Sequence, residues 1–327
     1  MIIPRILIHY PFILDLLFLV VIPLLLVYAG RRLSRRAQRH HRRSRLYPLS
    51  ILLAVLLVAV YVYGRFIGTR QLEVQKVEIS FADLPEAFDG YRIVQVSDLH
   101  SGSIDSTFLR RVVDSVNACR PDLIVFTGDM QNAEPSELEP MVPTLGRLKA
   151  TDGVCSVLGN HDYGFYSFNE ERDRVNNIGM LMTYQQDLGW HMLKNSRRFV
   201  THGDQRIVVA GMENDGEGRF PQLGDVQLSL YGANRGDFVV MLEHDPSAWR
   251  RKILRHCHAQ LTLSGHTHGG QVSLFGWTPV SLAYREYQGL YELGGRYIYV
   301  SKGLSGAIPF RLGAKPEIVL VTLKKKS

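Results

Sequence analysis

The sequence predicts an α/β protein preceded by two apolar helices, and three observations support this prediction. From about residue 73 onward, β-forming runs alternate with amphipathic helical runs, as is typical of an α/β domain. Five of the predicted strands end in a cluster of His, Asp or Asn residues. The first 69 residues contain two long apolar segments around an arginine-rich stretch. The length of 327 residues, with 46% hydrophobic and 21% charged residues, fits a folded chain of one large or two ordinary domains.

The two apolar segments predict a membrane anchor over residues 1–69. The first segment, residues 6–28, is about long enough to cross a bilayer, although Asp15 and Pro23 weaken it as a lipid-facing helix. The second segment, residues 47–67, has no charge before Arg65 and starts with a tyrosine, a residue that favours the membrane interface. A helical hairpin in the lipid bilayer is therefore expected, followed by a separate domain over residues 70–327.

The stretch between these segments, residues 30–46, carries eight Arg and two His. The positive-inside rule predicts that this loop stays in the cytoplasm, so that the domain lies on the periplasmic or extracellular side of the membrane. A cleaved signal peptide is a weaker interpretation, because no small-x-small cleavage pattern follows the second segment. A twin-arginine export signal around Arg42 and Arg43 is a further alternative, which Arg45 weakens because an apolar residue is usual there.

The chain's net positive charge belongs to this N-terminal region. The net charge is +7 and the isoelectric point is about 9.3, which by themselves suggest a phosphate-rich partner such as nucleic acid or an anionic membrane. Residues 1–69 hold ten Arg, no Lys and one acidic residue, whereas residues 70–327 hold 28 basic and 30 acidic residues. The anchor thus carries +9 and the domain −2, a balance that argues against nucleic acid as a partner.

The predicted strands of the domain run directly into polar motifs. The first strand, residues 75–81, is followed along the chain by strands at 91–96 before SDLH, 122–126 before TGD, 153–158 before GNHD, 238–242 before EHDP and 260–263 before SGHTHGG. Helices are predicted over residues 107–119, 137–148, 170–181 and 246–256. Because sites in open α/β sheets form outside the carboxyl ends of the strands, we expect these five motifs to converge on one place.

The ordered series DxH, GD, GNHD, H and GHTH resembles the calcineurin-like metallophosphoesterase superfamily, and the apolar hairpin resembles its membrane-anchored bacterial branch. The resemblance covers about residues 73–324. It implies a four-layer α/β/β/α sandwich with two divalent metal ions. One ion would be held by Asp98, His100 and His268, the other by Asn160, His244 and His266, and the Asp129 carboxylate would bridge them.

The types of these residues suit that chemistry. Imidazole nitrogen and carboxylate oxygen favour Mn, Fe or Zn, while the three separated Cys residues, which form no CxxC motif, predict no thiolate site. One residue separates Asp98 from His100, so both side chains are expected on the same side of an extended segment. The resemblance further implies attack by a metal-bridging hydroxide, with His161 protonating the leaving group and Asp162 orienting His161.

Three further positions carry expectations. Many members of the superfamily have GDxxD, but this chain has GDMQN, which places Asn132 where a second Asp could support the histidine by charge. The aromatic stretch 163–168 is expected either to wall a substrate pocket or to pack in the core. Arg311 is expected at the surface, with phosphate binding as the alternative.

The sequence therefore predicts a membrane-anchored phosphoesterase that hydrolyses phosphodiester bonds. Its substrate would be a phosphoester, with a lipid-linked one as an option. A pyrophosphatase of the UDP-2,3-diacylglucosamine type is the alternative, and topology discriminates, because that substrate is made in the cytoplasm. A non-catalytic scaffold ranks lower, because scaffolds of this fold usually lack several metal ligands and every ligand position is filled here.

Overall fold

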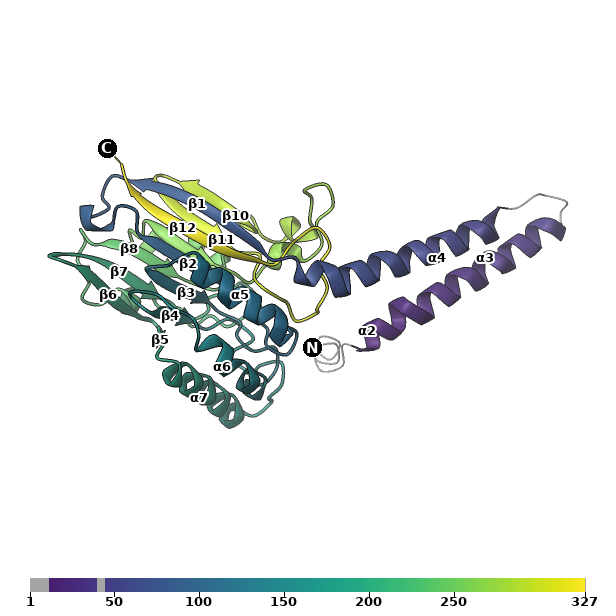
Figure 1. Cartoon of the computed structure of the whole chain (residues 1–327), viewed down its shortest axis with the longest axis horizontal. Coiled ribbons are helices and arrows are strands. Elements are labelled where there is room, and N and C mark those ends of the chain that lie inside the picture. The colour runs from purple at the N-terminus through teal and green to yellow at the C-terminus, as the bar shows by residue number, and fades with distance from the viewer. Residues whose placement is uncertain (1–11, 40–44, 327) are drawn as a thin grey trace.

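The computed structural model describes residues 12–39 and 45–326, which form a two-sheet domain and a projecting pair of helices (Figure 1). The first sheet has the strand order β1-β12-β2-β3-β4-β5. Its strands are β1 (Glu73–Phe81), β2 (Arg92–Val96), β3 (Leu123–Thr127), β4 (Val154–Val157), β5 (His191–Met192) and β12 (Glu317–Lys325). Strands β2 to β5 run parallel, and β12 is antiparallel to β2.

The second sheet has the order β10-β11-β9-β8-β7-β6. Its strands are β6 (Ser196–His202), β7 (Gln205–Gly211), β8 (Phe238–Leu242), β9 (Leu261–Ser264), β10 (Gly289–Leu293) and β11 (Arg296–Val300). Strands β7, β8, β9 and β11 are parallel, while β6 and β10 are antiparallel edge strands. The predicted α/β class is confirmed, with two mixed sheets, and the six predicted strands are β1, β2, β3, β4, β8 and β9.

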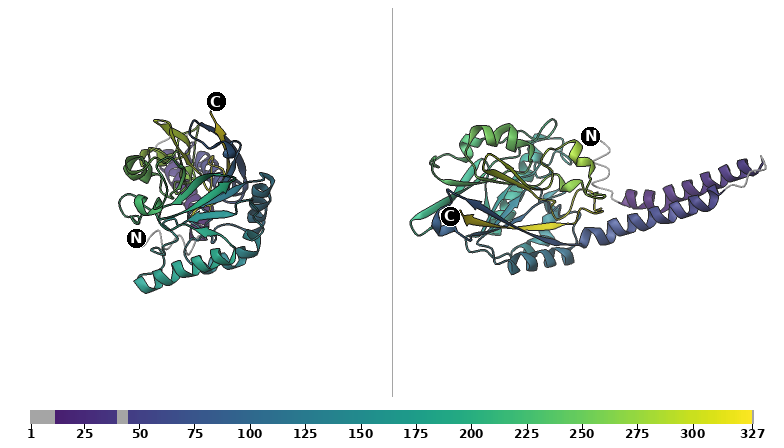
Figure 2. Two further views of the ribbon diagram at one scale, coloured as in Figure 1. Left: turned by 90° about the vertical axis from the view of Figure 1, so that its left-hand side faces the viewer. Right: turned by 90° about the horizontal axis from the view of Figure 1, so that it is seen from above.

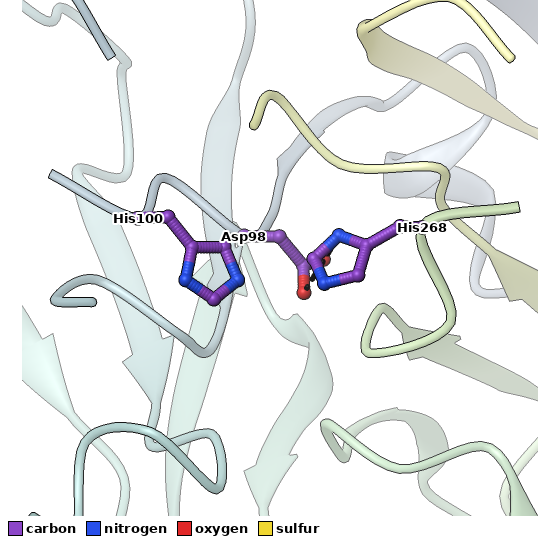
Figure 3. Close-up of side chains that lie close together, drawn as sticks. All are labelled: Asp98, His100 and His268. Atoms are coloured by element: carbon purple, nitrogen blue, oxygen red, sulfur yellow. Dashed lines mark ion pairs between the residues drawn. The ribbon is translucent and has the colours of Figure 1, made fainter. Parts of the chain in front are cut away.

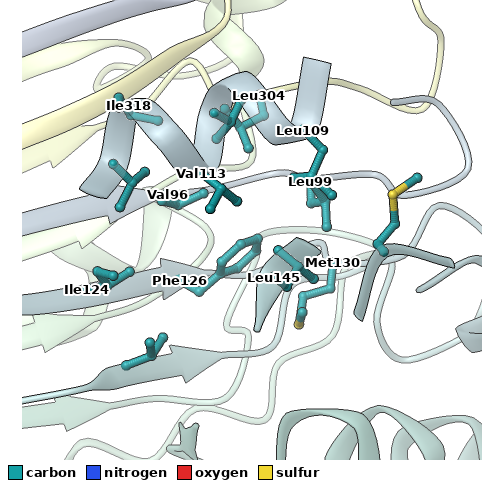
Figure 4. Packing of buried hydrophobic residues seen from close by; sticks show 14 of the residues in the cluster. Val96, Leu99, Leu109, Val113, Ile124, Phe126, Met130, Leu145, Leu304 and Ile318 are labelled. Atoms are coloured by element: carbon teal, nitrogen blue, oxygen red, sulfur yellow. The ribbon is translucent and has the colours of Figure 1, made fainter. Parts of the chain in front are cut away.

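Hydrophobic clusters hold the layers together. One cluster lies between the sheets and joins β2, β3 and β12 to β7, β8 and β9. A second packs α5 (Ser106–Ala118) and α7 (Glu171–Asp187) on the outer face of the first sheet. In Figure 4, Leu109 and Val113 of α5 lie over Val96, Ile124 and Phe126. A third packs the π-helical turn η6 (Trp249–Ile253) and α8 (Val226–Ser229) on the second sheet.

The predicted helices differ from the structure mainly at their ends. Helix α5 matches its prediction within one residue at either end, and α7 continues six residues beyond the predicted end at Leu181. The helix predicted over residues 137–148 is instead a 3-10 helix, η5 (Pro135–Met141), followed by the short α6 (Val142–Leu145). Prolines interrupt it, because Pro140 and Pro143 donate no backbone hydrogen bond. The helix predicted over 246–256 is η6 followed by α9 (Leu254–His256).

The N-terminal residues form two long helical stretches that lie side by side and extend away from the domain (Figures 1 and 2). The stretches Phe12–Gln38 and Leu46–Arg70 are long and apolar enough to cross a membrane. The first comprises α2 (Phe12–Leu16), a π turn, η1 (Leu17–Val21), and α3 (Ile22–Arg39). The second comprises α4 (Leu46–Val62), a π turn, η2 (Tyr63–Ile67), and a 3-10 turn, η3 (Gly68–Arg70). Residues 6–11 of the first predicted span and Arg42 and Arg43 lie outside the described residues.

These helices differ from the predicted hairpin in one respect. Helix α3 continues through Arg39, so much of the predicted arginine-rich loop is helical. Asp15, which weakened the first segment as a span, has partners on the second: the Tyr61 hydroxyl donates to its Oδ1 over 2.7 Å, and Arg65 Nε does so over 3.2 Å. At the far end Tyr47 donates its backbone NH to Ser34 Oγ, and Gly30 lies so close to Ser50 that a Cβ there would collide with it.

Candidate metal centre

The five polar motifs meet where three strands of the first sheet and two of the second end. Gln95 of β2 donates from Nε2 to the Ser264 carbonyl of β9 over 2.8 Å, which joins the two sheets beside the motifs. His244, just after β8, contacts the Thr127 carbonyl at the end of β3 over 2.7 Å. The expected convergence of the strand ends therefore occurs, and it brings all seven predicted metal ligands into one region.

Backbone conformation at these residues is unusual. Five of the seven predicted ligands have a positive φ, in the left-handed region that non-glycine residues seldom adopt: Asp98 (52°), His100 (44°), Asp129 (55°), His266 (71°) and His268 (53°). The expectation that Asp98 and His100 flank an extended segment is therefore wrong. The left-handed backbone at each residue, held by hydrogen bonds such as His100 N to Asp129 O at 3.0 Å, aims the side chains inward instead.

The side chains form a buried, overlapping cluster. Asp98, His100 and His268 offer ligand atoms that all lie within 4.8 Å of one another, and so do Asp98, Asp129 and His244. Figure 3 shows the first group, with the imidazoles of His100 and His268 on either side of the Asp98 carboxylate. These are also the three residues that the resemblance implies for one ion.

Asp129 and Asn160 connect the remaining residues to this cluster. Asp129 Oδ2 lies 3.5 Å from His100 Nε2 and 3.3 Å from His244 Nε2. Asn160 Oδ1 lies 3.2 Å from His244 Nε2 and 2.7 Å from His266 Nδ1. Asp129 thus faces histidines of both predicted ligand groups, as a residue between two ions must.

In His244 and His100, Nε2 faces Asp129, and the other ring nitrogen, Nδ1, contacts an oxygen atom of the protein. His244 Nδ1 contacts the Thr127 carbonyl, and His100 Nδ1 lies 3.2 Å from Asn132 Oδ1. Oxygen acceptors at Nδ1 keep the proton there and leave the Nε2 lone pair for a metal ion. Within the described residues, His100 Nε2 and His268 Nδ1 are buried without a hydrogen-bond partner. The donor set and these unpartnered nitrogens fit a divalent cation.

The pKa values in the cluster follow from burial and from the carboxylates. Burial raises the pKa of Asp98 to about 6 and lowers that of His100 to about 3. Burial also lowers the pKa of His268. At His244 burial acts in the same direction, but the Asp129 carboxylate outweighs it and raises the pKa to about 10. His100 and His268 are therefore neutral and carry no second ring proton that would compete with a metal, and the carboxylates favour positive charge.

His161 and Asp162 occupy different environments. His161 Nδ1 lies 2.7 Å from the backbone carbonyl of Asn132, and the ring stacks on Tyr166 with centroids 4.3 Å apart. The Asp162 carboxylate instead accepts the backbone NH groups of Met130, Gln131 and Gly159 over 2.9–3.2 Å. Asp162 thus joins two of the motif loops, and the partner of His161 Nδ1 is the Asn132 carbonyl.

Asn132 contributes to both halves of this arrangement. Its side-chain oxygen faces His100 while its Nδ2 donates to Ser103 Oγ over 3.1 Å, and its backbone carbonyl faces His161. An amide can serve both partners because it both accepts and donates. The departure from GDxxD therefore places a neutral group behind His100, while His161 is oriented by the backbone.

A cavity of about 430 Å³ opens over the cluster. Its walls include several residues that sequence reasoning missed, namely Arg219, Phe220, Val280 and Tyr284. Tyr284 OH lies 2.8 Å from His266 Nε2, and Asp245 Oδ2 lies 3.4 Å from the same nitrogen. Asp245 stood in the EHDP motif, but no sequence signal singled out Arg219 or Tyr284. Of the flagged aromatic stretch, Tyr166 lines the cavity and Tyr163 is buried.

Arg311 is buried, contrary to the expectation of a surface position, with 1% of its area exposed. Its guanidinium donates to the backbone carbonyls of Lys302, Ser305 and Ala314. Ser305 in turn donates its backbone NH to the Asp98 carbonyl over 2.9 Å. The three carbonyl oxygens replace water around the buried charge of Arg311. Through these bonds Arg311 holds the 302–305 segment beside Asp98.

Comparison with known proteins agrees with this site. A family model described as calcineurin-like phosphoesterase matches residues 91–270, a range that contains all seven predicted ligands. The uncharacterized metallophosphoesterase YkuE of Bacillus subtilis is 32% identical over 280 residues, which cover 81% of this chain and 90% of that protein. A transmembrane protein with metallophosphoesterase domain from Danio rerio is 30% identical, covering 90% of this chain and 68% of its own. An uncharacterized metallophosphoesterase of Aquifex aeolicus is 30% identical, covering 78% and 93%.

Proposed function

The chain belongs to the calcineurin-like phosphoesterase family, and we propose that it is a membrane-anchored, dinuclear phosphodiesterase. The family assignment makes it a phosphoester hydrolase with a buried Asp/His metal-binding cluster. The observation that supports two ions is the position of Asp129, whose Oδ2 faces His100 and His244 at 3.5 and 3.3 Å. One ion would be held by Asp98, His100 and His268, and the other by Asn160, His244 and His266.

Two divalent cations, Mn, Fe or Zn, would supply an activated water and stabilise negative charge on the phosphoryl oxygens. The protein's own groups supply orientation and a proton. With Nδ1 of His161 at the Asn132 carbonyl, Nε2 is the nitrogen left to give a proton to the departing oxygen. Asp162 keeps the loops of Asp129 and His161 in register through three backbone bonds.

The proposed domain organisation is an anchor over residues 1–69 and a four-layer α/β/β/α catalytic domain over residues 70–327. Support comes from the two apolar helices, the pairing of Asp15 with Tyr61 and Arg65, and the two helical layers that cover the sheets. The arginines between the two apolar segments favour a cytoplasmic location for that stretch and a periplasmic or extracellular location for the domain in a bacterial inner membrane. A reporter fused after Ser327 that is active only in the cytoplasm would contradict this orientation.

Metal content and hydrolysis measured on one sample test the catalytic proposal. The purified full chain should bind about two Mn²⁺ ions and hydrolyse bis-p-nitrophenyl phosphate faster than p-nitrophenyl phosphate. Asp129→Asn should lose at least one ion and about 10³-fold or more in activity, because the carboxylate between the ions loses its charge. Asp114→Asn is the matched control, because Asp114 is exposed and pairs only with Arg147 among the described residues. Full metal binding without hydrolysis of either ester would favour a scaffold role.

A further inference from the structure

A second cavity lies where the N-terminal helices meet the domain. It has a volume of about 280 Å³, and most of the side chains that line it are apolar. The helices contribute Leu14, Phe18, Tyr61 and Arg65, and the domain contributes Gly270, Gln271, Val272, Ile308, Pro309 and Phe310. We call it the junction cavity. Four of its ten lining residues thus belong to helices that are apolar enough for a bilayer.

The junction cavity adjoins the cavity over the metal cluster. Ile308 lines both. Two chain segments pass from one cavity to the other: His268 lines the first and Gly270 the second, and likewise Ala307 and Pro309. Each pair is two residues apart, so the cavities are about 7 Å apart along the chain at most. That spacing matches the few atoms that separate a phosphate from an acyl chain in a lipid.

Specific contacts fix this junction. The Phe310 ring stacks on Tyr61 of α4 with centroids 5.8 Å apart, and Arg311 donates its backbone NH to the Gly64 carbonyl over 2.9 Å. Gln271 Nε2 donates to the carbonyls of Ile308 and Phe310 over 2.7 and 3.1 Å. The cavity is therefore built jointly by anchor and domain and depends on both.

An exposed apolar loop adjoins the junction. Leu274, Phe275, Trp277 and Leu282 expose 51%, 109%, 56% and 81% of their areas. The loop is tied to the junction by Ser273, whose backbone NH donates to the Leu312 carbonyl over 2.7 Å. Val280 of the same loop lines the metal-site cavity. Clustered exposed apolar residues that include Trp are typical of surfaces that contact a membrane.

We propose, on the basis of the phosphoesterase function above, that the substrate is a membrane lipid phosphoester. Its acyl chain lies in the junction cavity and its phosphate enters the cavity over the metal cluster. The occupant is a lipid because helices of the anchor wall the cavity and the apolar loop lies beside it, so a chain enters from the bilayer. In the reaction, the oxygen of water forms a new bond to phosphorus, the bond from phosphorus to the leaving oxygen breaks, and a proton passes to that oxygen.

A series of p-nitrophenyl alkyl phosphodiesters tests the proposal, because the reacting group stays constant while the chain grows. Ethyl, octyl and hexadecyl esters are compared on the full-length protein in maltoside micelles at a fixed detergent concentration. We expect kcat/KM to rise at least tenfold from ethyl to octyl, since each buried methylene contributes about 0.8 kcal/mol. Leu14→Trp, which fills the junction cavity, should abolish most of that rise, and the smaller Leu14→Phe should reduce it in part.

Leu16→Trp is the matched control, because Leu16 is 53% exposed on the same helix and does not line the junction cavity. It should keep the full preference for the octyl ester. Equal values for ethyl and octyl esters in the wild type would overturn the lipid proposal, as would an octyl preference that survives in Leu14→Trp. Bis-p-nitrophenyl phosphate reports on the metal centre alone, so a failure to hydrolyse it would overturn the phosphoesterase proposal first and the lipid proposal with it.

Discussion

The helical hairpin exposes apolar side chains, whereas the strand-end loops bury polar side chains that make specific contacts. Along the hairpin, side chains such as Leu52 and Val55 are 63% and 60% exposed and are specified only by being apolar. In the loops, Asp98 and His244 are fully buried. The Asp98 carboxylate accepts the His266 backbone NH, and His244 Nδ1 contacts the Thr127 carbonyl. The comparison teaches that composition specifies the hairpin, whereas individual residues specify the site. Substitutions should therefore have large effects in the loops and small ones along the hairpin.

The largest effect within the loops, after loss of a ligand, is expected at His161. His161→Asn should lower turnover of a diester with a poor leaving group about 10²- to 10⁴-fold, because the departing alkoxide then lacks its proton donor. The loss should be much smaller for a p-nitrophenyl ester, whose leaving group needs no proton. Metal content should stay at the wild-type level. The measurement is kcat/KM for both esters beside metal analysis.

The exposed His191 supplies the control for that experiment, as His191→Asn should change neither ester. An equal loss for both leaving groups would contradict proton donation by His161. It would indicate that the ring orders the site instead.

A smaller effect, on metal affinity, is expected at Asn132, which contacts the predicted ligand His100 on the ring nitrogen that faces away from Asp129. Asn132→Ala removes the oxygen that faces His100 Nδ1, and such partners typically contribute 10- to 100-fold in metal affinity. We therefore expect Mn²⁺ affinity to fall by about that factor while activity at saturating metal largely recovers. Titration of metal-free protein measures this change. Asn234→Ala, at an exposed position, should bind Mn²⁺ like the wild type, and unchanged affinity in Asn132→Ala would show that His100 needs no such support.

The smallest effect on catalysis is expected in the hairpin, even where its two helices lie closest, at Gly30 and Ser50. Gly30→Leu places a side chain where Ser50 already lies, so the helices must move apart. The free energy of unfolding should fall by about 1–3 kcal/mol, with turnover of a soluble diester unchanged within about twofold. Ala29→Leu, one residue away on the exposed side, should leave thermal unfolding in micelles unaltered. A marked loss of soluble-diester turnover in Gly30→Leu would break the contrast between the two regions.

Much of the fold and the grouping of the site residues could be predicted, because strong local patterns carried them. Strands β2, β3, β4, β8 and β9 are buried apolar runs that end in dense polar motifs, and parallel strands gather such ends. The histidines and carboxylates come together through that topology alone. Hydropathy similarly predicted the two N-terminal helices, because a long apolar run is enough to indicate a helix of membrane-spanning length.

The remaining features depend on tertiary contacts that leave no local pattern. Edge strands β6 and β10 are half exposed and lack an apolar run. Arg311 reads as a surface residue until the carbonyls of Lys302, Ser305 and Ala314 surround it. The positive φ values of Asp98 and His100 arise because neighbouring loops hold the backbone in place. The junction cavity needs residues about 290 positions apart, such as Leu14 and Ile308, and no window of sequence contains both.

The hydrogen bond from Arg311 to Gly64 of η2 and the stacking of Phe310 on Tyr61 of α4 join the domain directly to the second N-terminal helix. If the helices span a bilayer, these contacts would restrict swinging of the domain and would hold its metal cluster at one height and one angle above the surface. Its encounters with a membrane-borne molecule are then those of lateral diffusion in two dimensions. The rate would follow the mole fraction of that molecule among the lipids, and diluting the membranes in buffer would leave it unchanged.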